Sequence, residues 1–234
     1  MNNKIQLITY IDRLACKNID ELNSLIQNQL EGLFGGIHIL PFFNSIDGAD
    51  AGFDPINHTQ IDPRLGDWND LKSLTENIEV MSDLIVNHIS AESKQFQDYI
   101  KKGDSSDYKD LILTKDKVFP AAASEEDVSK IYRPRPGLPF TPFVLDDGSE
   151  ELVWTTFTSN QIDIDVNSEM GGAYLENILD TFQKAGITMI RLDAAGYAIK
   201  KPGTSCFMID ETYDFISHLT EKAKSRSIEI LVEI

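Results

Sequence analysis

The stretch "ITMIRLDAAGY", residues 187–197, is an apolar run that ends in charge. Most of its side chains favour burial, but Arg191 and Asp193 carry opposite charges. Residues two apart on a strand project to the same face, so these two side chains lie together. The stretch therefore predicts a buried strand whose carboxyl end opens onto a functional rim.

Similar apolar runs recur along the chain, at residues 5–10, 35–43, 79–89 and 228–234. Helical spacing of apolar residues separates them, at residues 18–32, 66–76, 168–186 and 210–227. Strands that alternate with helices form a parallel sheet covered by helices. Parallel strands buried on both faces are continuously apolar, as these are. The sequence therefore predicts an α/β fold.

Polar residues at the strand ends favour a barrel over a doubly wound sheet. No GxGxxG or GxxxxGK[ST] motif follows a predicted strand, which argues against the doubly wound sheets that bind nucleotides. The expected fold is the first five strands of a (β/α)8 TIM barrel, in which all strand ends open onto one face. A complete barrel has eight strands and about 250 residues, so we expect the remainder to be missing and the chain to be part of a longer protein.

The stretch after the third predicted strand interrupts the alternation. It is polar, rich in proline and glycine, and without sustained periodicity. We therefore expect a first part of the barrel at 1–89, a long irregular insert at 90–166, and a continued, truncated barrel at 167–234.

Charge and cysteine content exclude several classes of partner. The 38 acidic and 21 basic residues give a net charge of -17, which repels nucleic acid and anionic membrane surfaces. Cys16 and Cys206 are the only cysteines and form no CxxC motif, which indicates free thiols in a reducing compartment. No secretion signal or membrane-length apolar run is recognised, so we expect a cytoplasmic protein.

Asp193 and Glu233 end consecutive predicted strands. Adjacent parallel strands lie about 4.8 Å apart, so the two carboxylates can flank one reacting bond. Retaining glycoside chemistry needs such a pair, about 5–5.5 Å apart. The alternative is two solvated acids in an acid-rich chain. Arg191 is expected to keep Asp193 ionised, as a nucleophile requires.

Three other features bear on a sugar site. His88 ends the third predicted strand and could donate a hydrogen bond to a sugar hydroxyl, although a lone histidine is more often structural, as we expect for His38; His218 is expected at the surface. Asp50 and Phe53, in the turn-rich loop 47–58, suit a sugar pocket, because a carboxylate accepts from hydroxyls and a ring stacks. The D-x-x-D spacing of that loop does not match a calcium-binding EF-hand.

The segment "IYRPRPGLPF", residues 131–140, concentrates positive charge in an acidic chain. Pro134 and Pro136 stiffen the loop that carries Arg133 and Arg135. Arginines held by a stiff loop suit an anion such as phosphate. The alternative, a solvated loop beside an acidic neighbour, is equally open.

Several of these motifs together resemble a known family. "LIVNHIS", "MIRLDAAGY" and "LVEI", in this order, resemble three regions of the α-amylase superfamily of glycoside hydrolases and transglycosylases. "QLITYIDR", "HILPFFNSIDGADAGFDPINHT", "RPRPGLPF" and "DIDVNSEMG" are similar to the sucrose phosphorylases within it. After the Asp-Ala pair, typical amylases continue with Lys or His, whereas this chain continues with Ala195, Gly196 and Tyr197, as in the phosphorylases.

The resemblance implies that residues 90–166 are an inserted irregular second domain between the two parts of the catalytic barrel, 1–89 and 167–234. It also implies roles for individual residues. Asp193 is expected to be the nucleophile and Glu233 the acid/base, while the superfamily's third carboxylate has no position in this chain. Independently of the resemblance, the positive charge concentrated in "RPRPG" leads us to expect that Arg135 and Arg133 bind phosphate. The remaining substrate-binding residues are expected to be Asp50, Phe53, His88, Arg191, Leu192, Phe157 and Tyr197.

The expected activity is glucosyl transfer from sucrose to inorganic phosphate, which gives glucose 1-phosphate and fructose without a metal or organic cofactor. Related phosphorylases acting on sucrose 6-phosphate or glucosylglycerol are alternatives, as is an amylase-type hydrolase. A non-catalytic half-barrel that binds sugar or a partner chain is an alternative of another class. A homodimer is also open.

Overall fold

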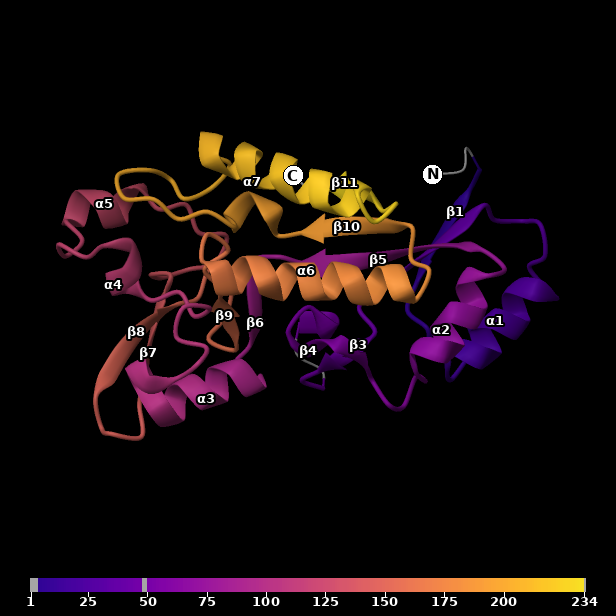
Figure 1. Ribbon diagram of the computed structural model, residues 1–234, viewed down its shortest axis with the longest axis horizontal. Helices are drawn as coiled ribbons and strands as arrows, with labels where there is room; N and C mark the ends of the chain where they lie inside the picture. Colours follow the sequence, from indigo (N-terminus) through magenta and orange to yellow (C-terminus); the bar gives the residue numbers. More distant parts are fainter. Residues whose placement is uncertain (1–3, 48–49, 234) are drawn as a thin grey trace.

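A computed structural model describes residues 4–47 and 50–233. The predicted strands form one parallel sheet with the order β1-β2-β5-β10-β11. The bounds of these strands are β1 Gln6–Thr9, β2 Gly36–Ile39, β5 Glu79–Ile85, β10 Met189–Asp193 and β11 Glu229–Val232. The parallel sheet and its five strands agree with the part of a TIM barrel expected from the sequence (Figure 1).

Four helices connect these strands, as predicted. They are α1 Ile19–Gln27, α2 Trp68–Thr75, α6 Glu169–Lys184 and α7 Asp210–Lys224. Asn18, Asp67 and Ser168 cap the first three, because each side chain accepts from a free backbone N–H of the first turn. The expected α1 was longer; it ends at Gln27 because the Asn28 side chain donates to the Ser24 carbonyl at 2.7 Å.

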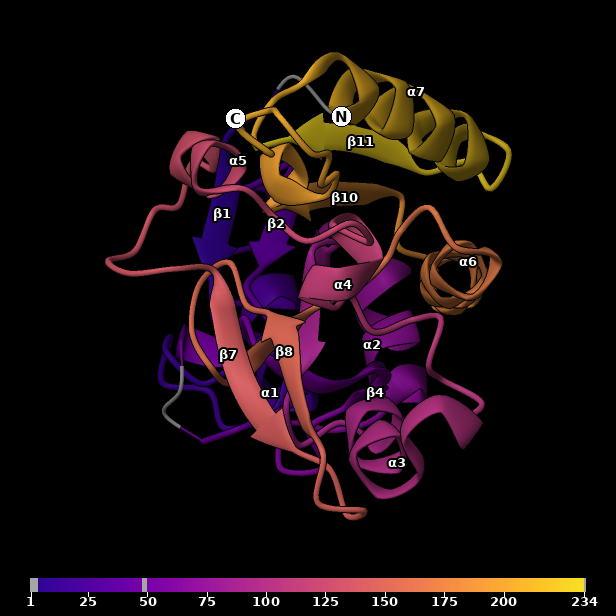
Figure 2. The same ribbon diagram turned by 90° about the vertical axis from the view of Figure 1, so that its left-hand side faces the viewer.

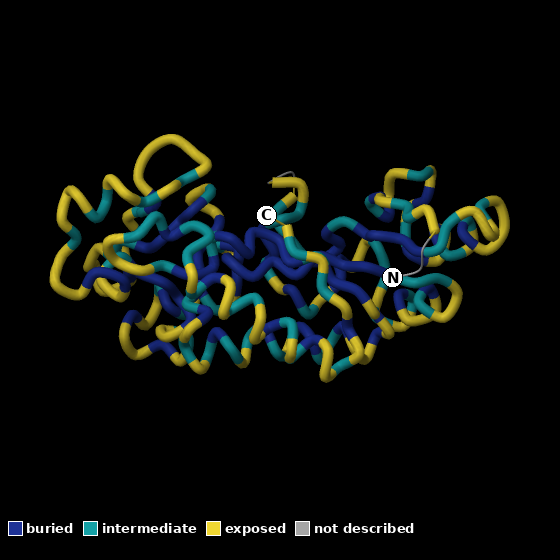
Figure 3. The backbone as a smooth tube through the Cα atoms, turned by 90° about the horizontal axis from the view of Figure 1, so that it is seen from above, coloured by how far each residue is buried: buried dark blue, intermediate teal, exposed yellow. Residues whose placement is uncertain are grey.

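The two faces of the sheet differ in chemistry. One face packs against the helices and buries Ile37, Val80 and Ile190 completely. Figure 3 shows that buried backbone, in dark blue, runs along the middle of the molecule. The opposite face, the interior side of the barrel, carries Arg191 beside Asp83 in register. Successive side chains of a strand point to opposite faces of the sheet. The same strands therefore contribute to an apolar core on one face and to a charged site on the other.

The segment after β5 has more regular structure than its sequence indicated. β6 His88–Ser90 pairs antiparallel with β9 Gln161–Asp163, and β7 Phe140–Val144 pairs with β8 Glu150–Trp154. Its helices are α3 Lys94–Lys102, η2 Gly103–Ser105, α4 Lys115–Val118 and α5 Glu125–Lys130. These elements gather at one end of the molecule, toward which β5 and β10 point (Figures 1 and 2).

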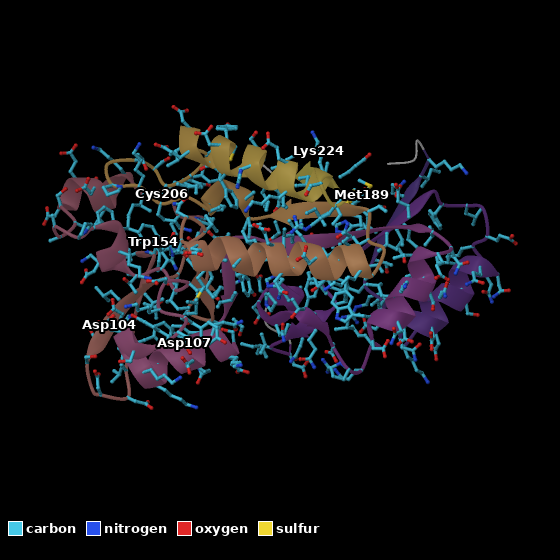
Figure 4. The ribbon with its side chains drawn as sticks, in the orientation of Figure 1. Asp104, Asp107, Trp154, Met189, Cys206 and Lys224 are labelled. Carbon is cyan, nitrogen blue, oxygen red and sulfur yellow. The ribbon has the colours of Figure 1, made fainter. Side chains whose placement is uncertain are left out.

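This end of the molecule has a small hydrophobic cluster of its own. Trp154 and Cys206, both labelled in Figure 4, pack there with Leu113, Val118 and Phe119. Cys16 and Cys206 are buried free thiols, in keeping with the sequence. Among the helices of the described residues, none has the length and apolar character needed to cross a membrane.

The loop expected at 47–58 is partly regular. It contains η1 Asp50–Gly52 and the start of β4 Pro55–Ile61, which pairs with β3 Phe43–Ser45, while residues 48 and 49 lie outside the described residues. A second short helix, η3 Ala195–Tyr197, is separated from the end of β10 by one residue. These two short elements place Asp50 and Tyr197 beside the strand ends.

Candidate active site

A cavity of about 440 Å³ opens at the carboxyl ends of β10 and β11. Nine of the residues singled out in the sequence line it, which are Asp50, Phe53, His88, Arg135, Phe157, Arg191, Asp193, Tyr197 and Glu233. They come from segments far apart in the chain, and the parallel sheet brings them to one face, as in other barrels.

The Arg191 guanidinium joins three carboxylates at the base of this cavity. Its Nη1 lies 2.5 Å from Asp83 Oδ1 and 3.1 Å from Asp193 Oδ1, and its Nη2 pairs with Glu233. Glu233 follows β11, and its Oε2 also accepts from the Ala194 backbone N–H at 3.3 Å. Asp193 and Glu233 therefore lie against one planar cation, at the ends of adjacent strands.

Asp83 is a member of this site that the sequence reasoning missed. It is fully buried on β5, and its second oxygen lies 3.0 Å from His38 Nε2. Buried carboxylates are rare unless they are paired. The presence of Asp83 within an apolar run that predicts a buried strand was therefore the one sequence feature that pointed to a paired acid there. His38, expected to be structural, is buried and makes this contact, and His218 is exposed as expected.

The pKa of Asp193 differs from the expectation that Arg191 would keep this group ionised. Burial and, secondarily, the negative charge of Glu233 raise the pKa of Asp193 to about 7. The Arg191 charge acts in the opposite direction but is outweighed. Arg191 stabilises the ionised form of Asp193 only weakly, because it also pairs with Asp83 and Glu233. Burial removes Asp193 from the water that would otherwise solvate its charge.

Hydrogen bonds fix the opposite wall of the cavity. His88 Nε2 lies 2.7 Å from the Phe53 carbonyl oxygen, which orients the ring toward that loop. Gln161, not anticipated from the sequence, donates to Asp50 Oδ2 at 2.8 Å and to the Phe53 carbonyl at 3.2 Å. Burial lowers the pKa of His88, which favours its neutral form. His88 lines the cavity, where we expected it to donate to a sugar hydroxyl, and its Nε2 contacts the Phe53 carbonyl oxygen.

Aromatic rings form a continuous third wall. The ring centroids of Phe157 and Tyr197 are 5.1 Å apart, and those of Tyr197 and Phe207 are 4.7 Å apart. The Arg191 guanidinium lies 5.8 Å from the Phe53 ring centroid. Phe207 lines the cavity but was not anticipated, because nothing in its local sequence distinguishes it from a core residue. Such rings suit the apolar faces of a sugar.

Two residues expected at the site lie elsewhere. Leu192 is fully buried against the core, because it projects to the face opposite Arg191 and Asp193. Arg133 donates to the backbone carbonyls of Thr155, Thr156, Pro136 and Phe157. The structure thus brings Arg135 into the cavity, whereas the guanidinium of Arg133 is engaged by the protein backbone.

Comparisons with known proteins show which proteins the chain resembles. The chain is 59% identical over 234 residues to a sucrose phosphorylase of Agrobacterium vitis and 50% identical to one of Bifidobacterium adolescentis, spanning 48% and 46% of their lengths. The crystal structure of sucrose 6F-phosphate phosphorylase from Thermoanaerobacter thermosaccharolyticum superimposes with a TM-score of 0.93 at 42% identity, covering 100% of this chain and 48% of that one.

The chain therefore spans about half the length of the curated relatives it matches. More distant solved structures, at 14–19% identity, share the fold with TM-scores of 0.77–0.80. Residues 30–233 match the family described as Alpha amylase, catalytic domain. The chain belongs to the α-amylase family.

Proposed function

We propose that the protein is a sucrose phosphorylase, which transfers the glucosyl group of sucrose to inorganic phosphate with retention of configuration. The observation that carries the proposal is the placement of Asp193 and Glu233 on one guanidinium, in a cavity that Arg135 also lines. The sucrose phosphorylases with which the chain shares 59% and 50% identity support the choice of donor and acceptor.

In the first step, the Asp193 carboxylate attacks the anomeric carbon of the glucosyl group. Glu233 donates a proton to the glycosidic oxygen, and fructose leaves. Asp193 acts as a nucleophile only when it is ionised. Since its pKa is raised to about 7, the rate of this step should change with pH around neutrality. Phe53 and Phe157 pack against the sugar, and Asp50 accepts from its hydroxyls.

In the second step, a phosphate oxygen attacks the same carbon and Asp193 leaves. Glu233, now ionised, takes the phosphate proton if one is present, which follows from microscopic reversibility. Two inversions give α-glucose 1-phosphate. Arg135 anchors the incoming anion, which otherwise meets the field of a chain with net charge -17. We further propose that residues 90–166 form a domain inserted in the barrel and supply this anchor.

The test is product analysis of the full-length protein with sucrose and inorganic phosphate. Formation of α-glucose 1-phosphate and fructose in equal amounts supports the proposal. Parallel reactions with sucrose 6-phosphate and glucosylglycerol identify a different natural substrate if either gives a higher kcat/KM. Release of free glucose alone, with or without phosphate, would indicate a hydrolase instead.

A further inference from the structure

Lys200 is a buried lysine that lies beyond η3 and does not line the cavity. Its side chain is 1% exposed, and its Nζ lies 2.5 Å from Asp163 Oδ2 and 2.6 Å from Asn87 Oδ1. Asp163 belongs to β9 and Asn87 follows β5. One ammonium group therefore joins the segment after β10 to two other segments that flank the cavity.

The other contacts of Asp163 run toward the segment that follows β8. Its two oxygens accept from the backbone N–H of Thr156 at 2.9 Å and from the Thr156 hydroxyl at 2.6 Å. Burying an ion pair costs desolvation free energy, and a hydrophobic pair of similar size is often at least as stable. The pair is therefore poorly explained by stability alone, whereas it does fix the position of Thr156.

Thr156 in turn contacts the loop that carries Arg135. Arg133 Nε donates to the Thr156 carbonyl at 3.0 Å, and Arg133 Nη2 donates to the carbonyls on either side, each at 3.2 Å. Arg133 Nη1 donates to the Pro136 carbonyl and so closes its own loop. Arg135, two residues further on, lines the cavity.

These contacts form one continuous path from Lys200 through Asp163, Thr156 and Arg133 to the loop of Arg135. We infer that Lys200, Asp163 and Arg133 are positioning residues, which hold residues 133–137 over the cavity so that the Arg135 guanidinium meets the phosphate acceptor. The inference rests on the proposed function. It also changes the expected role of Arg133 from phosphate ligand to support for Arg135.

The test uses the double variant Lys200→Met/Asp163→Asn of the full-length protein, which removes both charges so that neither remains buried alone. The KM for phosphate should rise by about tenfold, because a loosened loop no longer holds the Arg135 guanidinium where it contacts the phosphate. The rate of fructose release in the first turnover should stay within about twofold of wild type. The exposed pair in Lys201→Met/Glu211→Gln is the matched control, and it should change neither quantity.

A double-mutant cycle separates positioning from a general structural effect. In an Arg135→Ala background, Lys200→Met/Asp163→Asn should produce no further rise in the phosphate KM, since its effect passes through Arg135. A full additional rise in that background, or an unchanged phosphate KM in the wild-type background, overturns the inference.

Hydrogen exchange supplies a readout that does not depend on the proposed function. The amides of Tyr132, Arg133, Arg135 and Gly137, the residues of this loop that carry a backbone N–H, should exchange faster in Lys200→Met/Asp163→Asn than in the control, even if sucrose proves not to be the substrate. Unchanged exchange there would contradict the positioning role. Absence of glucose 1-phosphate from the wild type, with faster exchange in the variant, would reject the proposed function alone.

Discussion

Arg191 Nη1 lies 3.1 Å from Asp193 Oδ1, yet the pKa of Asp193 is raised to about 7. Burial is the largest cause, followed by the charge of Glu233. The same guanidinium also contacts Asp83 and Glu233. One cation thus serves three carboxylates, and its effect on the one proposed as nucleophile is correspondingly weak.

This relationship predicts how stability depends on pH. A carboxyl whose pKa rises from 3.8 unfolded to about 7 folded binds its proton more tightly in the native state. Its contribution is fully present below pH 3.8 and is lost as the pH rises through about 7. Since a pKa difference of one corresponds to about 1.4 kcal/mol, the total loss is on the order of a few kcal/mol.

Asp193→Asn should therefore flatten the decline in Tm between these two pH values. Thermal unfolding of the full-length protein across this range measures it, with the exposed Asp12→Asn as control. A decline in Tm as steep as that of wild type would place the pKa of Asp193 near its ordinary value.

Asp83→Asn should destabilise the protein by about 3 kcal/mol or more, because it leaves the buried His38 without its carboxylate and removes one of the three carboxylates that pair with the partly buried Arg191. Denaturant unfolding of the full-length protein gives the change in unfolding free energy. The matched control is Asp98→Asn, which breaks a more exposed pair with Lys102 and should cost about 1 kcal/mol or less. Equal effects of the two substitutions would show that Asp83 has no special structural role.

Arg135→Ala should raise the KM for phosphate at least about tenfold and the KM for sucrose far less, since a charge-assisted contact to the anion is lost. Products should shift from glucose 1-phosphate toward free glucose. Arg135→Lys should rescue only in part, because an ammonium lacks the planar fork of a guanidinium. Arg13→Ala, an exposed arginine outside the cavity, is the control. A phosphate KM that does not change would remove Arg135 from the acceptor site.

Glu233→Gln should impair reaction with sucrose by about a hundredfold or more, because general acid catalysis is lost. The first step with α-glucosyl fluoride should be largely preserved, since fluoride leaves with little protonation. Rapid measurement of fructose and fluoride release compares the two donors. Equal losses on both would argue against an acid role for Glu233.

The sheet was accessible from the sequence because its inner strands, such as β5 and β10, are almost entirely buried and read as largely apolar runs. The edge strands β1 and β11 are partly exposed but carry the same apolar character. Short helices such as α4, Lys115–Val118, were not, since their stability depends on packing against distant segments. Asp193 and Glu233 could be anticipated because strand ends meet at one face. Asp83 could not be placed, because its partners lie on other strands. The sequence also could not decide which arginine of "RPRPG" faces the cavity.

The most direct test of the account is to trap the covalent intermediate. Glu233→Gln of the full-length protein, supplied with α-glucosyl fluoride and no phosphate, should accumulate a glucosyl-enzyme, because the base needed to activate water is absent. Peptide mass spectrometry should then find one hexosyl group on Asp193, and added phosphate should release it as α-glucose 1-phosphate. A hexosyl group on another residue, or full turnover without any adduct, would contradict the assignment of Asp193 as nucleophile.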